Sequence, residues 1–203
     1  MSAEVMLDFL AASSPESRLG FQAANHCGPV LKGIKISNIM TAEKGAWRRL
    51  QRALRGSSIL CVLLAVHRER EILLLYRYGG LKNHLEKVQV REFLISCGYD
   101  DMAVASVLIR LRSRYARYVL SGQGFPHELG VILEYPVEDV RGFIENRGKN
   151  FLMEKYWKVY HDREQALVTF ALYDQARETA IGEVIAGYPL HEVAVEEREE
   201  ITE

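Results

Sequence analysis

The chain has 203 residues, 48% of them hydrophobic and 26% charged, which is the balance of a globular protein and excludes a disordered or fibrous chain. This length is sufficient for one core without disulfides or metals, so we expect a single domain over residues 1–203 with flexible ends at 1–15 and 195–203. The net charge of -1 hides an asymmetry, because residues 41–120 contain 15 Lys or Arg and 7 Asp or Glu, and residues 121–203 contain 8 and 17. We expect the two parts to neutralise each other within the fold, and the alternative is that the basic part meets nucleic acid or an acidic partner.

The sequence lacks the patterns of a secreted or membrane protein. The first twenty residues contain Glu4 and Asp8 and no basic segment followed by an apolar one, so they do not resemble a signal peptide. The longest apolar run, Ile59–Val66, is shorter than the roughly 20 residues that a membrane span needs. We therefore expect a cytoplasmic protein without a membrane partner, whose three widely spaced cysteines are reduced thiols rather than a disulfide framework.

The first predicted elements are a helix and a hairpin. Residues 42–55 are predicted to be helical, because large apolar residues recur at spacings of three and four. Ile59–Val66 and Ile72–Tyr78 are predicted to pair as an antiparallel hairpin. The first strand is apolar throughout, so we expect it to be covered on both faces, and we expect the second strand to lie nearer an edge.

Helices are predicted to follow the hairpin. One covers Val88–Cys97 and ends at Gly98, and the next is capped by Asp100 and reaches about Tyr118. Pro126 and Pro136 each stand at a first helical position, which predicts two short helices in tandem.

The last predicted elements are a third strand, Tyr156–Tyr160, and a long helix capped by Asp162 that ends near Gly187. Alternation along the strand sends Trp157 and Val159 into the core. The predicted fold class is α+β, with a small antiparallel sheet, made of the hairpin and this third strand, packed against several helices.

Three stretches of the chain resemble the domain of unknown function family 3793, which is found in anaerobic bacteria and archaea. They are HCGPVLKGIKISNIM (26–40), CGY (97–99) and the block from FPHE to WKVYHD (125–162). The resemblance covers nearly the whole chain and implies a family but no activity. The chain departs from the family pattern at Glu134, where glycine looks usual, and at Gly28, where alanine does.

Cys27 is a candidate catalytic residue, because His26 precedes it and an imidazole or a following helix N-terminus could activate a thiolate. The alternative is a small buried hydrophobic residue. His26 and Cys27 are also weak candidates for a metal or haem iron, although no HExxH or CxxC spacing supports a metal site. No cofactor is indicated.

Lys35 and Asn38 are candidate ligand-binding residues. If their segment is helical, they share a face and could hold one carboxylate or phosphate together. A solvated helix surface explains the same pattern.

His127 and Glu128 stand in the first turn of the helix that Pro126 opens, where free backbone amides favour an anion. His127 is a second catalytic candidate, as a proton donor, and its alternatives are a metal ligand or a hydrogen bond that pins the preceding loop. Glu128 could simply cap its own helix. Lys158 and Tyr160 alternate with the core residues of the third strand, so they face either water or a pocket.

The first functional hypothesis is a domain that binds a small, anionic ligand between the 26–38 segment, the FPHE turn and the WKVY strand, with His127 at the edge of a concave pocket near Lys35 or Lys158. Whether it also acts on that ligand as an enzyme stays open. The second is a regulatory or adaptor module that meets nucleic acid or an acidic protein through Arg48, Arg49, Arg52, Arg55 and Arg110–Arg117. The third is a haem, iron or thiol redox protein. The oligomeric state is not indicated.

Overall fold

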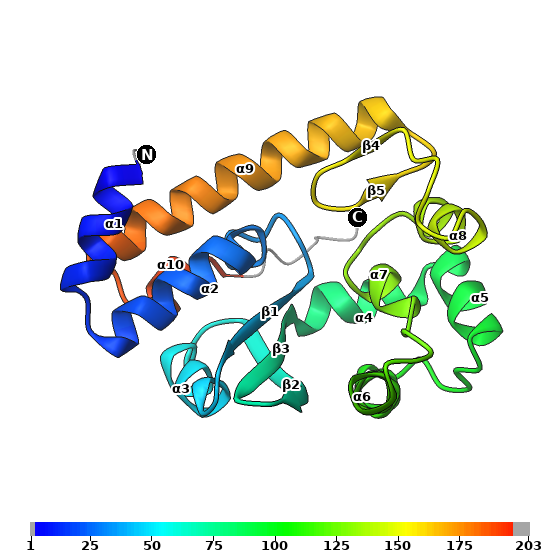
Figure 1. Ribbon diagram of the computed structural model, residues 1–203, viewed down its shortest axis with the longest axis horizontal. Helices are drawn as coiled ribbons and strands as arrows, with labels where there is room; N and C mark the ends of the chain where they lie inside the picture. The colour runs from blue at the N-terminus through cyan, green and yellow to red at the C-terminus, as the bar shows by residue number, and fades with distance from the viewer. Residues whose placement is uncertain (1–2, 197–203) are drawn as a thin grey trace, which may run out of the picture. The chain divides into compact units, whose positions relative to one another are not determined.

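The computed structural model describes residues 3–196, which form two compact units (Figure 1). Unit 1 contains the described residues up to 78 and from 173 onward, and unit 2 contains residues 79–172. The single domain expected over residues 1–203 stays a prediction, because two compact units can still fold together. The flexibility expected of the two ends falls in part on residues 1–2 and 197–203, which lie outside the described residues.

Unit 1 contains a three-stranded antiparallel sheet in the order β1-β3-β2, formed by β1 (Ser37–Glu43), β2 (Ile59–His67) and β3 (Arg70–Arg77). The α+β class and the β2–β3 hairpin are therefore confirmed. The third strand was wrongly assigned, because it is β1 that pairs with the hairpin. Tyr156–Tyr160 contributes only the two-residue strand β5 (Lys158–Val159), which pairs with β4 (Met153–Glu154) in unit 2.

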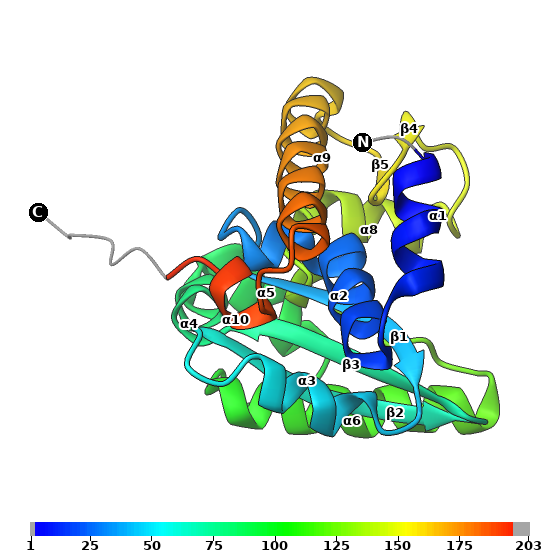
Figure 2. The ribbon, with the colours of Figure 1, turned by 90° about the vertical axis from the view of Figure 1, so that its left-hand side faces the viewer.

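The position of the hairpin strands in the sheet was also wrongly predicted. The central strand is β3, in which all residues from Glu71 to Arg77 are buried, and β2 is an edge strand with exposed positions at Leu60 and Val66. A central strand can only be recognised from its neighbours on both sides, and the partner on the second side, β1, was not predicted. Figure 2 shows the three strands running side by side.

The helices of unit 1 are α1 (Ala3–Ala12), α2 (Pro15–Leu31), α3 (Ala46–Ala53), α10 (Leu190–Val193) and the part of α9 (Arg163–Ile185) from Tyr173 onward. Ser14 caps α2 by accepting a hydrogen bond from the Ser17 amide. The helix predicted over residues 42–55 is shorter, because Ala42 and Glu43 pair with β3 instead.

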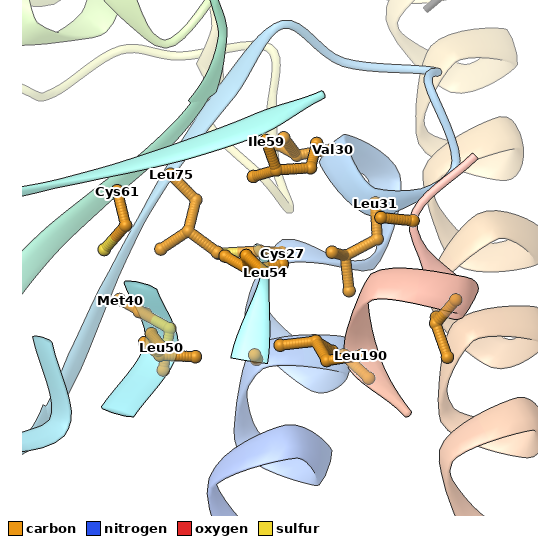
Figure 3. Packing of buried hydrophobic residues seen from close by; sticks show 14 of the residues in the cluster. Cys27, Val30, Leu31, Met40, Leu50, Leu54, Ile59, Cys61, Leu75 and Leu190 are labelled. Atoms are coloured by element: carbon orange, nitrogen blue, oxygen red, sulfur yellow. The ribbon is translucent and has the colours of Figure 1, made fainter. Parts of the chain in front are cut away.

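The core of unit 1 lies between the sheet, α2, α3 and the C-terminal part of the chain (Figure 3). Leu73 and Leu75 project from the central strand into this core, where they join Cys27 of α2 and Leu50 of α3. Each buried aliphatic side chain of this kind contributes about 1.5–3 kcal/mol to folding. Burial of these side chains therefore holds α2 and α3 against the sheet.

Unit 2 is mainly helical. Its elements are α4 (Tyr78–Glu86), which begins at the last residue before the unit, α5 (Val88–Ser96), α6 (Val104–Ser121), α7 (Glu128–Ile132), α8 (Val137–Glu145), β4, β5 and the part of α9 up to Leu172.

The predicted helices of unit 2 are present, with boundaries that shift by a few residues. Asp162 accepts a hydrogen bond from the Gln165 amide and so caps α9 as predicted. Asp100 does not cap α6, whose N-cap residue is Ala103 without a side-chain cap, and Asp101 instead accepts from the Ala103 amide and the Ser106 hydroxyl. Trp157 and Val159 are buried as expected. None of the helices within residues 3–196 is long and apolar enough to cross a membrane.

Candidate functional site

Lys35 and Asn38 contact each other in unit 1. Lys35 Nζ donates a hydrogen bond to Asn38 Oδ1 over 2.9 Å and lies 5.5 Å from the centre of the Tyr173 ring. Asn38 belongs to β1, so the segment is not helical, and its Nδ2 donates to the His26 carbonyl. Only 2% of Lys35 is exposed. These bonds connect the start of β1 to α2, and anion binding by the pair stays a prediction.

Cys27 lies at a kink in α2 and is completely buried. Burial raises the pKa of the Cys27 thiol far above its ordinary value, and nearby Cys61 acts in the same direction, while Lys35 opposes them. The reactive form of cysteine is the thiolate, so this environment favours the buried neutral thiol. His26, in contrast, is exposed. Within residues 3–196 no three His, Cys, Asp or Glu side chains are placed to hold a metal ion.

Glu128 is the buried partner of an arginine in unit 2. Its carboxylate forms an ion pair with Arg114 of α6 and accepts a hydrogen bond of 3.2 Å from the hydroxyl of Tyr99. Glu128 is 1% exposed, and no side chain caps α7. The carboxylate therefore joins α7 to α6 instead of capping its own helix, and removing Arg114 would leave an uncompensated buried charge.

His127 and Lys158 lie against the same ring. The centres of the His127 and Phe143 rings are 5.6 Å apart, and Lys158 Nζ is 5.9 Å from the Phe143 centre. Lys158 Nζ also donates to the Gly148 carbonyl over 2.9 Å, at the end of α8. Partial burial lowers the pKa of His127, while Glu128 opposes this change. The structure thus brings these two predicted site residues to one aromatic ring, and the pocket expected beside His127 stays a prediction.

Tyr160 packs against α8 at Gly142, where an added Cβ would lie 2.6 Å from the Tyr160 Cβ. The amides of Tyr160 and His161 both donate to Asp139 Oδ1, over 2.7 and 2.9 Å, and Trp157 Nε1 donates to Asp139 Oδ2 over 2.7 Å. Asp139 is 3% exposed. This carboxylate, in the first turn of α8, holds the WKVY segment on that helix.

The predicted site residues therefore fall into two groups. His26, Cys27, Lys35 and Asn38 belong to unit 1, and the remaining candidates, His127, Glu128, Lys158 and Tyr160, belong to unit 2.

The basic segment is divided in the same way. Arg48 to Arg55 lie on or just after α3 in unit 1, and Arg110–Arg117 lie on α6 in unit 2. Arg49 and Arg114 form ion pairs with carboxylates of their own units, and Arg110 lies 3.9 Å from Asp100. Of these pairs only Arg114–Glu128 joins the basic part of the sequence to the acidic part, so the expected neutralisation of one part by the other stays a prediction.

Unit 1 contains a cavity of about 300 Å³ that the sequence analysis did not place. Its walls come from the first turns of α2, from α3, from the end of α9 and from the segment that leads into α10. Lining side chains of both polar and apolar kinds are Glu16, Ser17, Leu19, Arg49, Leu50, Arg52, Ala53, Val184, Tyr188, Pro189, Leu190 and His191, with Gly20 and Gly187 completing the wall. This is the size of the smallest ligand sites.

Glu71 positions the helix that carries the arginines of this cavity. Its Oε1 accepts from the Gly45 amide over 2.9 Å and its Oε2 from the Trp47 amide over 2.8 Å. The buried carboxylate of β3 thereby satisfies amides at the N-terminus of α3, where a negative charge is also favoured by the helix dipole.

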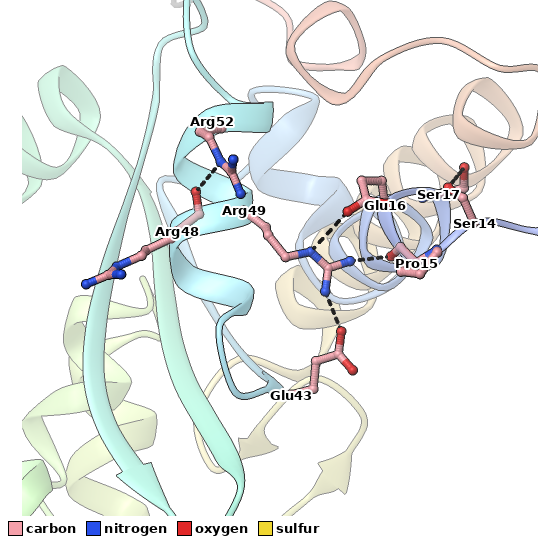
Figure 4. Close-up of polar contacts among 8 residues, drawn as sticks. All are labelled: Ser14, Pro15, Glu16, Ser17, Glu43, Arg48, Arg49 and Arg52. Carbon is pink, nitrogen blue, oxygen red and sulfur yellow. Dashed lines mark hydrogen bonds and ion pairs between the residues drawn. The ribbon is translucent and has the colours of Figure 1, made fainter.

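Arg49 lines the cavity, and Figure 4 shows its contacts with Glu16, Pro15 and Glu43. Its guanidinium donates to the Pro15 carbonyl over 2.6 Å, forms an ion pair with Glu43, and lies 3.6 Å from Glu16. Arg49 is therefore already matched by two carboxylates and connects α2, α3 and the end of β1. Its role in the wall is structural.

Arg52, one turn further along α3, has no such carboxylate. Its Nε donates a long hydrogen bond of 3.4 Å to the Arg48 carbonyl, and it forms no ion pair in the described part of the chain (Figure 4). Arg52 is exposed and lines the cavity together with His191. The sequence analysis named Arg52 only as part of the basic segment and did not name His191. Gly20 is the one local feature of the sequence that indicates this cavity, because a glycine within a helix leaves space beside it.

The comparisons with known proteins give one match. A family model described as a protein of unknown function, DUF3793, matches residues 23–194. Neither the curated proteins nor the solved structures contain a match to the chain.

Proposed function

The chain belongs to the family of proteins of unknown function DUF3793, whose description names no activity, and on the geometry of unit 1 we propose that it binds a small anionic ligand in the cavity of that unit. The proposal keeps the ligand class expected from the sequence and assigns it to Arg52 rather than to Lys35 or His127. Lys35 is buried and donates to Asn38, and neither His127 nor Lys158 lines the cavity, whereas Arg52 does.

The observation that carries the proposal is the arginine without an ion pair in the cavity wall. A guanidinium cannot lose its proton at any relevant pH and offers five donors in a planar fork. The guanidinium of Arg49 already contacts Glu16, Glu43 and the Pro15 carbonyl. Arg52, in contrast, has a single long bond to a carbonyl. An anion in the cavity would be the first charged partner of Arg52.

Exchanging Arg52 for glutamine tests this proposal. The full chain is titrated with sodium acetate and with inorganic phosphate against sodium chloride at equal ionic strength, and binding is followed by amide chemical shifts. We expect saturable chemical-shift changes in residues 46–53 and 187–191. The affinity derived from them should fall roughly ten- to hundredfold in Arg52→Gln, the range for loss of a charged hydrogen bond.

Arg48→Gln is the matched control, because Arg48 is exposed on the same helix and does not line the cavity. This variant should bind as the parent chain does. Absence of saturable shifts, or equal binding by Arg52→Gln and the parent chain, would refute the proposal.

A further inference from the structure

We infer that the ligand of this cavity is an organic monocarboxylate with a compact apolar body, a step that rests on the proposed anion site and names its ligand class. The cavity is amphipathic, with an apolar floor and a rim that carries polar groups and the free charge of Arg52. A simple inorganic anion would leave the floor without a partner.

The floor consists of four aliphatic side chains that belong to the core of unit 1. Leu19 comes from α2, Leu50 from α3, Val184 from α9 and Leu190 from α10, and each is at most 7% exposed. Because these side chains already pack in the core, the floor is held in place by four elements. An apolar group that enters the cavity would pack on this floor and would thereby be removed from contact with water.

The rim favours one negative charge over two. Arg52 supplies the guanidinium, and Ser17, Tyr188 and His191 supply further polar groups to the lining. Glu16 also lines the cavity, and its carboxylate lies near Arg49. Glu16 opposes each negative charge on the ligand, an effect that solvent reduces because this carboxylate is exposed, so a ligand with one charge is repelled less than one with two. This argument selects a carboxylate over the dianionic form of a phosphate.

Volume sets the size of the apolar body. A cavity of about 300 Å³ holds on the order of ten waters, and thus a ligand of roughly that number of non-hydrogen atoms. Short-chain, branched-chain and aryl-substituted carboxylates fit this limit.

Gly20 controls how much of the volume is open. A Cβ at this position would meet Val184 Cγ1 at 3.8 Å, an ordinary contact, and no other atom within 4 Å. Because Gly20 lines the cavity and its Cβ position is open, we expect a larger side chain at residue 20 to occupy part of the cavity. Substitution of Gly20 can therefore reduce the apolar part of the cavity without changing Arg52.

The test is a ligand series on the full chain, measured by calorimetry or amide shifts. Acetate, butyrate, hexanoate and phenylacetate are compared with inorganic phosphate and with uncharged hexanol. Burial of one methylene is worth about 0.8 kcal/mol, so affinity should rise roughly fourfold for each methylene that enters the floor. Hexanoate should bind better than both phosphate and hexanol, and Arg52→Gln should weaken it while Arg48→Gln should not.

Variants at residue 20 test whether the apolar body of the ligand binds beside Gly20. Gly20→Ala should bind the series almost as the parent chain does, whereas Gly20→Leu should lose the gain with chain length and keep the weak binding of acetate. Urea denaturation of each variant checks that it is folded.

The outcomes separate the two proposals. Arg52-dependent binding of phosphate or acetate without a gain for longer chains overturns the inference and leaves the anion site intact. A gain with chain length that is unchanged in Gly20→Leu also overturns the inference, because the apolar body then lies elsewhere. Equal binding of hexanol and hexanoate, or no binding by any probe, overturns both proposals.

Discussion

Helix α9 passes so close to Gly28 of α2 that a Cβ at Gly28 would lie 2.6 Å from the Cα of Arg177. The Arg177 amide nitrogen and the Ala176 carbonyl are within 3.4 Å of the same position. Since these are backbone atoms, they cannot turn away as the end of a side chain could. The close approach brings α9 against the residue that follows the kink at Cys27.

Gly28→Ala should therefore lower the free energy of unfolding by about 1–3 kcal/mol, the usual cost of overpacking a core. Gly20→Ala, in the same helix, is the matched control, since its added methyl group has room. The control should raise stability by up to about 1 kcal/mol, because alanine is the better helix former. Urea denaturation of both variants provides the comparison, and equal stabilities would contradict the packing argument.

Glu71→Ala should destabilise the protein by about 1–2 kcal/mol, because the amides of Gly45 and Trp47 would lose their acceptors at the start of α3. Glu69→Ala removes a neighbouring carboxylate whose ion pair with Lys44 is exposed, and should change stability by less than about 0.5 kcal/mol. Thermal unfolding of the two variants checks this. If both changes were equally mild, Glu71 would not be a cap of any consequence.

Glu134 adopts a left-handed conformation with φ of 64°, at the position where the family resemblance pointed to glycine. Glycine adopts this conformation without the steric cost that any Cβ introduces. Comparing Glu134→Gly with Glu134→Ala removes the side-chain contacts in both cases and isolates the backbone effect. We expect the glycine variant to be about 1 kcal/mol more stable than the alanine variant in urea denaturation, and the reverse order would exclude strain at this residue.

His84 should make the stability of the protein depend on pH in the acidic range. Its Nε2 lies 2.9 Å from the Val131 carbonyl, and its buried Nδ1 has no hydrogen-bond partner in the described part of the chain. Burial lowers the pKa of His84 below the ordinary value of 6.5, the hydrogen bond to Val131 opposes this change, and Lys87 adds to it.

The sign follows from the lowered pKa. Above about pH 6.5 His84 is neutral in both the folded and the unfolded chain, so the full stability is present. As pH falls below that value, the unfolded chain binds a proton that the folded chain does not, and stability decreases until the folded pKa is passed. His84→Gln should reduce this slope in urea denaturation between pH 7 and 5. His67→Gln, at an exposed position, should leave the slope unchanged; an equal slope in the His84 variant would contradict the assignment.

Local sequence features determined a good part of the fold. The β2–β3 hairpin is formed by neighbours in the chain, and its strands are apolar enough to be recognised alone. Asp162 marks the start of α9 through its side chain, which accepts from an amide three residues on, and Gly98 marks the end of α5 through its left-handed backbone, so neither needs a distant partner. The same is true of Pro136, which stands at the start of α8. These features depend on a few adjacent residues, so they can be predicted from one sequence.

Pairing across long stretches of chain was decided only by the tertiary structure. Ser37 of β1 pairs with Tyr76 of β3, and this contact makes β3 the central strand, which no local pattern in β3 could reveal. The candidate site has the same origin. Its lining residues come from 16–20, 49–53 and 184–191, and they meet because their apolar neighbours share one core. The sequence contained Arg52 as one arginine in a basic run, and only the folded chain separates it from Arg49, whose charge is matched by Glu16 and Glu43.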